Sequence, residues 1–279
     1  MKPVDALAPG LPVCRYIKQE NRRQVCVGIA PLTISEFDPE LESELLFGET
    51  VEVLEWGFEK VRVRSEVDHS VGWIDRAHLS ETIFNPTHWI CVPITFALEE
   101  NAVQSREIFP LGMCSRVQVI EEGGYFCKLW GAGWVHKSTI APINETAGDY
   151  VEVALRFTGP ERGSPYGWGG RSGRKLDCSA LVQLSLMLSG HTDVPRNSGE
   201  QRKTLGVRVR VKDGFRRGDF VFWKGHVAVM TSSTMLVHAT GNGGMAVIEE
   251  PLEDVRIRLR KQEGKKILAV RRLPNYHCS

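Results

Sequence analysis

The heptapeptide Leu176-Asp177-Cys178-Ser179-Ala180-Leu181-Val182 places a cysteine at the start of an expected helix. Asp177 is a favourable N-cap residue because its carboxylate accepts hydrogen bonds from the free N–H groups of a first helical turn. Those N–H groups and the helix dipole stabilise an anion, so we expect the pKa of the Cys178 thiol to fall and thiolate to form at neutral pH. The same N–H groups are suited to an oxyanion hole. The alternative is that Cys178 is an ordinary buried helix residue.

The C-terminal half of the chain is expected to be of α+β type. Apolar residues three and four apart predict a helix over 149–157, and the helix that begins at Cys178 is expected to end at Ser189, before Gly190. After Arg196 the pattern becomes strand-like, with apolar runs at 218–223, 226–230, 235–239, 255–259 and 267–271. Basic and apolar residues alternate over 207–212 and 256–261, which is typical of the solvated face of an edge strand.

Two histidines lie on the strands that follow the helix. His226 comes after the expected turn Trp223-Lys224-Gly225, whereas His238 lies inside the apolar run 235–239. The ordinary interpretations are an exposed strand end and a core histidine with a satisfied hydrogen bond. With Cys178, however, the pair fits a different arrangement, in which one base takes the thiol proton and a third group orients that base.

The N-terminal half shows short alternating runs, which predict half-buried strands at 51–55, 60–64 and 117–121. Its turns, strands and Gly-Trp-aliphatic segments recur in the same order over Gly48–Leu79 and Gly112–Val135. That order resembles two bacterial SH3-like barrels, covering roughly 25–80 and 86–142. The alternative is that small antiparallel barrels in general share it. Residues 141–146 are interpreted as a linker, so the expected domains are 1–82, 83–145 and 146–279.

Five motifs of the C-terminal half occur in the order seen in NlpC-type papain-like cysteine peptidases of bacterial cell-wall metabolism, which the region of about 149–279 resembles. The resemblance implies a helix packed on an antiparallel sheet and no cofactor. It implies Cys178 as nucleophile, His226 as general base and His238 as the residue that orients His226. Tyr166 is implied to line the site and to help hold the oxyanion. The motifs are Pro165–Gly170, Asp177–Gln183, Pro195–Ser198, Gly218–Phe222 and Gly225–Val229.

With two SH3-like domains in front, the chain resembles in particular the γ-D-glutamyl-L-diamino-acid endopeptidases. These cleave the bond between γ-D-Glu and diaminopimelate in murein peptides that have a free N-terminal L-Ala. A carboxylate such as Asp177 near the cleft can bind an ammonium and so require a free amine. Its N-cap role is the competing interpretation, and the two can coexist. The ligand contacts implied by the resemblance are Asp177, Ser179, Arg196, Ser198 and Trp168.

The sequence also departs from that subfamily. In such enzymes the first SH3-like domain closes one end of the cleft, and an aromatic residue is expected just before its Gly-Trp pair. Ser70-Val71 stands there instead, so Glu44 or Trp73 is the candidate for this end of the cleft. Ala180 stands where a glycine is common after Cys-Ser.

Composition excludes several other classes of protein. The chain has 279 residues, 42% hydrophobic and 25% charged, with a formal net charge of +1. The hydrophobic content is enough to bury a core. The near-zero net charge gives no electrostatic footprint for binding a nucleic acid or an anionic membrane. No segment approaches the ~18–20 apolar residues of a membrane-spanning helix. The remaining histidines show no metal-ligand spacing. The Gly-rich segment 240–244 lacks the Lys-Ser/Thr of a phosphate loop and predicts a hairpin turn.

The compartment is expected to be the cytoplasm. The first ten residues contain an early Lys and Asp and no apolar core, unlike a secretory signal. The seven cysteines are odd in number and form no C-x-x-C pair, which favours a reducing environment.

Three functions remain open from the sequence. The favoured hypothesis is a cytosolic endopeptidase that trims imported murein peptides. The second is a protein that binds peptides or cell wall and has an inactive peptidase domain. The third keeps the fold but changes the reaction, to an exported peptidoglycan hydrolase, an amidase or an acyl transferase.

Overall fold

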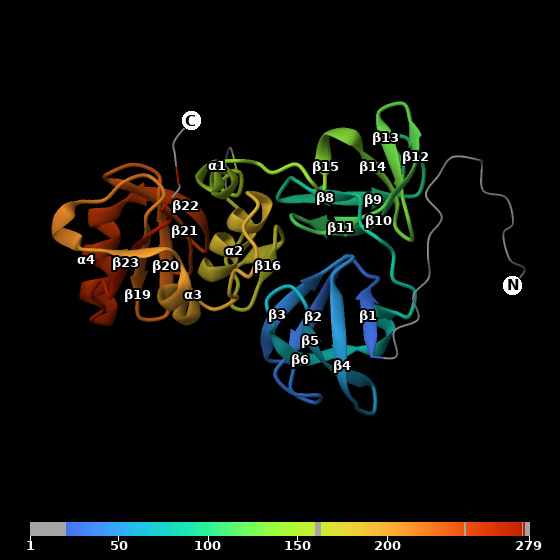
Figure 1. Cartoon of the computed structure of the whole chain (residues 1–279), viewed down its shortest axis with the longest axis horizontal. Helices are drawn as coiled ribbons and strands as arrows, with labels where there is room; N and C mark the ends of the chain where they lie inside the picture. Colours follow the sequence, from blue (N-terminus) through green and yellow to red (C-terminus); the bar gives the residue numbers. More distant parts are fainter. Residues whose placement is uncertain (1–20, 160–162, 243, 275, 277–279) are drawn as a thin grey trace, which may run out of the picture.

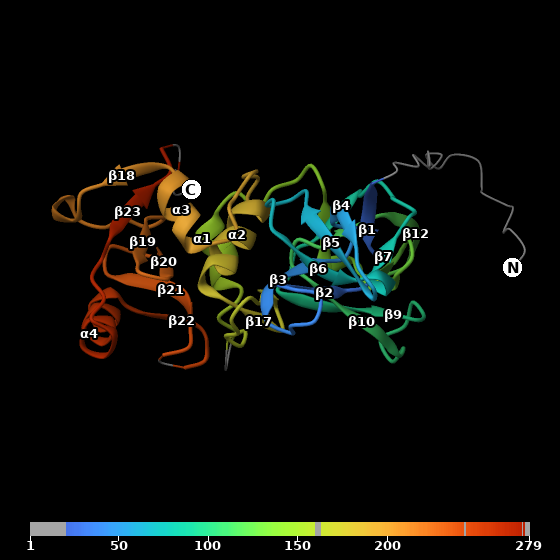
Figure 2. The same cartoon turned by 90° about the horizontal axis from the view of Figure 1, so that it is seen from below.

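The computed structural model describes residues 21–159, 163–242, 244–274 and 276. Figures 1 and 2 show two β units side by side on one side of the helix α2, and a six-stranded sheet on the other side. No helix among the described residues is long and apolar enough to cross a bilayer.

The first β unit is a seven-stranded antiparallel sheet in the order β3-β2-β6-β5-β4-β1-β7. The alternation predicted at 51–55 and 60–64 is confirmed, since Val51, Val61 and Val63 point into its apolar core. The strands are β1 (Arg22–Val25), β2 (Ile29–Thr33), β3 (Leu41–Leu46), β4 (Thr50–Trp56), β5 (Lys60–Ser65), β6 (Val71–Asp75) and β7 (Leu79–Ser80), with the 3-10 turn η1 (Arg76–His78) before β7.

The second β unit consists of two small sheets, in the orders β10-β9-β14-β13-β12 and β11-β8-β15. The predicted strand at 117–121 is divided, because Gln118 interrupts it between the two sheets. The predicted linker 141–146 begins later than expected, since Ala141 and Pro142 still pair with β8. The strands are β8 (His88–Ile90), β9 (Ile94–Leu98), β10 (Glu107–Gly112), β11 (Arg116–Val117), β12 (Val119–Gly123), β13 (Phe126–Leu129), β14 (Gly133–His136) and β15 (Ile140–Pro142), with η2 (Lys137–Thr139) before β15.

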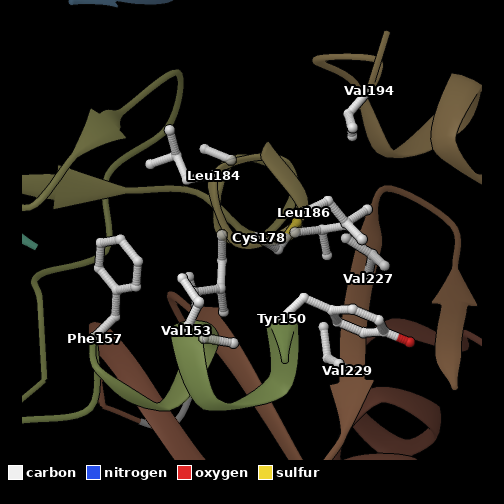
Figure 3. Packing of buried hydrophobic residues seen from close by; sticks show 14 of the residues in the cluster. Tyr150, Val153, Phe157, Cys178, Leu184, Leu186, Val194, Val227 and Val229 are labelled. Carbon is white, nitrogen blue, oxygen red and sulfur yellow. The ribbon is translucent and has the colours of Figure 1, made fainter. Parts of the chain in front are cut away.

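The C-terminal part packs two helices on an antiparallel sheet in the order β18-β23-β19-β20-β21-β22. Both predicted helices are present, as α1 (Tyr150–Leu155) and α2 (Cys178–Leu188), and Gly190 after α2 has φ +90° as expected of a residue beyond a helix end. Figure 3 shows α1 and β20 against α2, with Tyr150, Val153 and Val229 among the side chains that fill the space.

The strands predicted around the two histidines are confirmed as β19 (Phe220–Trp223), β20 (His226–Met230) and β21 (Met235–Thr240). The turn predicted at 240–244 joins β21 to β22 (Ala246–Pro251), with Gly243 outside the described residues. The edge strand predicted at 207–212 is present as β18 (Val207–Val209), followed by the 3-10 turn η3 (Val211–Asp213). The candidate strand at 267–271 is β23 (Ala269–Arg272). A two-stranded ribbon, β16 (Arg171–Ser172) with β17 (Lys175–Leu176), precedes α2.

The strand predicted at 255–259, and the edge strand predicted over 256–261, are wrong. This segment is the helix α4 (Leu252–Glu263). Its buried residues are Leu252, Val255 and Leu259, spaced by three and four, so the helical period buries one apolar stripe and exposes most of the basic residues. The short helix α3 (Ser198–Thr204) was not predicted, since only Gln201 is buried in it and it carries no apolar stripe.

The sheet has two differently covered faces. Val227, Val229 and Val237 lie in the core shared with α2, whereas Ala228, Met230 and Leu236 lie in the core shared with α4. Strand alternation therefore assigns each side chain of β20 and β21 to one helix or the other.

A buried arginine joins the first β unit to the C-terminal part. Arg171 is fully buried; its Nη1 donates to Glu49 at 2.9 Å, and its backbone N–H donates to Glu44 at 2.8 Å. Its Nε donates to Gln183 on α2. Breaking such a buried pair leaves an uncompensated charge, so these contacts hold the β3–β4 region against the middle of α2.

Candidate active site

Cys178 is the first residue of α2, as the heptapeptide predicts. The Asp177 side chain caps the helix by accepting from the Ala180 N–H at 2.8 Å. The Cys178 side chain is 7% exposed, and its sulfur is hydrogen bonded to the backbone of Val227 on β20. Figure 3 shows Cys178 at the edge of α2 beside Val227. The strand β20, whose first residue is His226, therefore begins beside the first turn of α2.

The two histidines form a hydrogen-bonded chain that ends on a carboxylate. His226 Nε2 lies 2.8 Å from His238 Nδ1, and His238 Nε2 lies 2.7 Å from Glu250 Oε1. The three residues come from the neighbouring strands β20, β21 and β22. His238 is almost fully buried, and its partners account for both of its ring nitrogens.

Burial determines the charge state of this cluster. Burial, and then the Asp177 carboxylate, raises the pKa of the Cys178 thiol to about 12. Burial lowers the pKa of His226 well below its usual value and lowers the pKa of His238 as well. The expected lowering of the thiol pKa at the helix start is therefore not found, because desolvation of the thiolate outweighs the backbone hydrogen bonds from Val227 and Ser179, which lower it. The resting cluster is a neutral thiol beside neutral imidazoles.

A cavity of about 90 Å³ opens beside the sulfur. It brings together five of the six predicted ligand contacts, from the loop before β16, the start of α2 and the start of α3. This volume is below the ~300–1,000 Å³ of a typical small-molecule site, so it admits only a short part of a peptide. The residues that line it are Glu42, Tyr166, Trp168, Gly169, Asp177, Cys178, Ser179, Asn197, Ser198 and Gly225.

Tyr166 and Trp168 form one wall of this cavity. Burial, and then the nearness of Cys178, raises the pKa of the Tyr166 hydroxyl to about 12, so the group is an O–H donor at neutral pH. Trp168 is 70% exposed and stands at the mouth.

Arg196 does not line the cavity but lies behind it. It is 3% exposed, and its guanidinium donates to both oxygens of Asp177, to Ser43 Oγ of β3 at 2.8 Å, and to the Gly170 carbonyl. Because Asp177 also caps α2, its carboxylate is occupied by protein donors. The competing interpretation of Asp177 as an N-cap is the one this geometry supports.

The first β unit contributes Glu42 to the cavity, and this differs from the sequence expectation. Neither Glu44 nor Trp73 lines the cavity; Glu44 accepts from the backbone of Arg171 and lies 3.8 Å from Lys175. Among the described residues the Glu42 carboxylate has no hydrogen-bond or ion-pair partner. The alternation Glu42-Ser43-Glu44 puts both carboxylates on one face of β3, so the sequence pattern alone did not distinguish them.

The NlpC/P60 family profile matches residues 163–257, and the profile described as the bacterial dipeptidyl-peptidase SH3 domain matches residues 35–79. The chain contains an NlpC/P60 domain. This domain belongs to a family of cysteine-type cell-wall peptidases, and an SH3 domain of the dipeptidyl-peptidase type precedes it.

The names of two curated proteins that are similar to this chain describe peptidases. The chain is 28% identical over 232 residues to a γ-D-glutamyl-L-lysine dipeptidyl-peptidase of Bacillus subtilis, covering 74% of each chain. It is 25% identical over 257 residues to dipeptidyl-peptidase 6 of Lysinibacillus sphaericus, covering 83% of this chain and 91% of the relative. An NlpC/P60 family protein from Bacillus cereus shares the fold, with a TM-score of 0.73 at 19% identity over 90% of this chain and 99% of that chain.

Glu250 of the NlpC/P60 domain is a site residue that sequence reasoning missed. In the β21–β22 hairpin His238 pairs with Ile248, so Glu250 is the diagonal neighbour of His238 on the same face of the sheet. Identifying Glu250 from the sequence requires the register of the hairpin. Glu249 and Glu250 are adjacent, and a one-residue slip of the strand exchanges the faces on which they lie.

Among the described residues, neither the NlpC/P60 domain nor the two β units offers a set of ligands for a metal ion. No group of three or more His, Cys, Asp or Glu side chains there is arranged to hold a metal ion. The cavity itself is lined by a thiol and a phenol, and the imidazole chain begins on the neighbouring strand β20.

Proposed function

We propose that this protein is a cysteine endopeptidase that hydrolyses the γ-D-glutamyl-diaminopimelate bond of short murein peptides with a free N-terminal L-Ala. The observation that carries the proposal is a Cys178 thiol, hydrogen bonded to the strand of His226, in a cavity that Glu42 of the SH3 domain also lines. The name of the Bacillus subtilis relative supports the γ-D-glutamyl linkage.

The reaction begins with the transfer of the Cys178 proton to His226 as the sulfur attacks the γ-carbonyl carbon of D-Glu. The C–N bond then breaks, and the protonated imidazole gives its proton to the leaving amine of the diamino acid. Water, deprotonated by His226, hydrolyses the thioester and restores the thiol. Since the thiol and the imidazole are both neutral at rest, proton transfer accompanies attack rather than preceding it.

Charge develops on the carbonyl oxygen during both attacks. Tyr166 lies in the cavity with its hydroxyl protonated, so its O–H donates to that oxygen together with N–H groups at the start of α2. Ser198 presents its hydroxyl to the polar groups of the peptide, and Trp168 covers its apolar part, whereas the Ser179 hydroxyl donates to Asp177 and supports that wall of the cavity.

Glu42 selects the peptide terminus. A carboxylate that has no side-chain partner among the described residues, and that lines a small cavity, binds an ammonium group by charge-assisted hydrogen bonds. An acetylated terminus has neither the charge nor the room, so only free L-Ala enters. A cavity of this size, lined in part by another domain, favours short peptides of murein recycling over intact cell wall.

We place this activity in the cytoplasm. The described cysteines Cys26, Cys91, Cys114, Cys127 and Cys178 are all free thiols, which is typical of a reducing compartment. Fractionation of cells that produce the protein tests this placement directly.

Mass spectrometry of L-Ala-γ-D-Glu-diaminopimelate after incubation with the protein tests the function. We expect release of diaminopimelate by the wild type and by Cys91→Ala, a matched cysteine control in the second β unit, and no release by Cys178→Ala. The N-acetylated peptide should remain intact, and the L-lysine peptide measures selectivity for the diamino acid. No cleavage of either free-amine peptide by the wild type overturns the proposal and favours a binding protein or another acyl substrate.

A further inference from the structure

Beyond the histidines, the hydrogen-bonded chain continues onto the helix α4. Arg258 Nη1 donates to Glu250 Oε2 at 2.9 Å, and Arg258 Nη2 donates to Glu250 Oε1, the oxygen that also accepts from His238. The Glu250 and Arg258 side chains are 16% and 19% exposed. Glu250 is therefore held between a fixed guanidinium and a buried imidazole.

We propose that Glu250, clamped by Arg258, is a positioning residue that fixes the tautomers of His238 and His226 and so directs the free lone pair of His226 to the Cys178 thiol. This inference rests on the proposed thiol mechanism, but it concerns a residue that does not line the cavity and does not touch the peptide.

The ionised carboxylate determines the position of each proton along the chain of imidazoles. An ionised Glu250 only accepts hydrogen bonds, so His238 Nε2 carries the proton that it donates. In a neutral His238 the other nitrogen, Nδ1, is then an acceptor. His226 Nε2 lies 2.8 Å from that atom and must donate to it. A neutral His226 is left with its lone pair on Nδ1, which makes Nδ1 the atom that takes a proton from the thiol.

Arg258 keeps Glu250 in the ionised form, in which the carboxylate accepts the hydrogen bond from His238. Burial alone raises the pKa of Glu250, but hydrogen bonds from Arg258 and His238 outweigh burial and lower it to about 2. Two N–H donors on a planar fork also fix the direction of the carboxylate. Without the clamp, Glu250 is free to turn away from His238.

Charges from each neighbouring element determine how the histidines titrate. His226 on β20 faces His238 on β21, Arg258 on α4 and Lys265 after α4, all of which lower its pKa beyond the effect of burial, whereas Glu250 on β22 raises it. Cys178 lies at the start of α2, Asp254 acts on Arg258, and Glu263 is paired with Lys265. Removing Glu250 therefore lowers the histidine pKa, and removing Arg258 raises it.

The experiment compares the pH profiles of kcat/KM for Glu250→Gln and Arg258→Met. We expect kcat to fall by about 10- to 100-fold in Glu250→Gln, by analogy with the loss of a hydrogen-bond partner that orients a metal-ligating histidine, with KM nearly unchanged. The acidic limb of the profile should move to lower pH in Glu250→Gln and to higher pH in Arg258→Met, by about one unit each.

Matched control variants make the same charge changes at residues that lie outside the hydrogen-bonded chain of His226, His238, Glu250 and Arg258. Glu249→Gln alters the adjacent carboxylate, which accepts from Thr231 on the other face of β22. Arg256→Met alters an arginine of α4 that is paired with Glu253 and lines a separate cavity. Both should keep the wild-type kcat and profile. Shifts of equal size in the controls, or shifts of the same sign in the two test variants, overturn the inference.

Nitrogen NMR of histidine-labelled protein separates this inference from the proposed function, because it needs no substrate. The wild type should show His238 protonated at Nε2 and His226 protonated at Nε2, and Glu250→Gln should show mixed tautomers. A wild type with these tautomers that cleaves no peptide contradicts the proposed substrate and leaves the inference standing. A wild type that cleaves the peptide with other tautomers overturns the inference and leaves the function standing.

Discussion

Arg196 and Asp177 form a buried two-point ion pair one residue before Cys178, with Nη1 to Oδ1 at 2.9 Å and Nη2 to Oδ2 at 2.7 Å. The same guanidinium donates to Ser43 of the SH3 domain. A single carboxylate thus caps α2 while its partner ties that cap to the neighbouring domain. The start of the helix, and the sulfur with it, is held from both sides.

Removing this carboxylate should destabilise the fold strongly. Asp177→Ala removes a helix cap and leaves the Arg196 charge buried without its partner, which costs about 3–5 kcal/mol. Urea denaturation followed by tryptophan fluorescence measures the change. Asp213→Ala is the control, since its pair with Arg210 is exposed and such pairs contribute about 0–1 kcal/mol. Equal losses in the two variants would contradict the role assigned to the buried pair.

Neutralising Glu42 should weaken peptide selection without unfolding the protein. Glu42→Gln loses a charge-assisted hydrogen bond to the peptide ammonium, worth about 1.5–3 kcal/mol, or roughly 10- to 150-fold in kcat/KM. Preference for the free-amine peptide over its acetylated form should fall with it. Glu40→Gln, an exposed change just before β3, should match the wild type. Retained selectivity in Glu42→Gln would assign recognition of the amine to another group.

The sequence predicts most features of this site that depend on neighbours along the chain. It predicts few that depend on contacts between strands or between domains. The N-cap at Asp177, the helix that starts at Cys178, and the strands of His226 and His238 all follow from local spacing, because each depends on neighbours along the chain. Tyr166, Trp168, Ser179 and Ser198 were named from family motifs, and the cavity brings them together.

The failures share one cause, since each needs a position in space that local spacing does not contain. Glu42 and Glu44 are equivalent by strand alternation, and docking of the SH3 domain through Arg171 selects between them. Glu250 depends on the register of a hairpin. The segment 255–261 alternates as a strand does. Its buried residues Val255 and Leu259 nevertheless follow the helical period, because the helix α4 packs on one face of the sheet.

Buried neutral histidines should make the fold sensitive to mild acid. His226 and His238 have pKa values below 6.5 in the folded state because of burial, so below about pH 6.5 the unfolded chain binds more protons than the folded one. Stability is then lost as pH falls, by up to about 1.4 kcal/mol per pH unit for each group. The urea midpoint between pH 7 and 5 should fall less steeply in His238→Asn than in the wild type. His69→Asn, an exposed position with φ 62° that asparagine tolerates, should keep the wild-type slope, and equal slopes in all three proteins would contradict the prediction.

The resting thiol should be unreactive until a substrate carbonyl is in place. With a pKa of about 12 set by burial and by Asp177, almost no Cys178 is thiolate at pH 7, and thiolate is the form that iodoacetamide alkylates. Alkylation of Cys178, followed by peptide mass mapping, should therefore be slower at pH 7 than that of free cysteine, and its rate should still rise above pH 9, where free cysteine has levelled off. Cys178→Ala identifies the labelled peptide, and Cys26, which is only partly buried, serves as the internal reference. Alkylation of Cys178 that is faster than free cysteine and flat between pH 6 and 9 would instead establish a standing thiolate–imidazolium pair, and proton transfer would then precede attack.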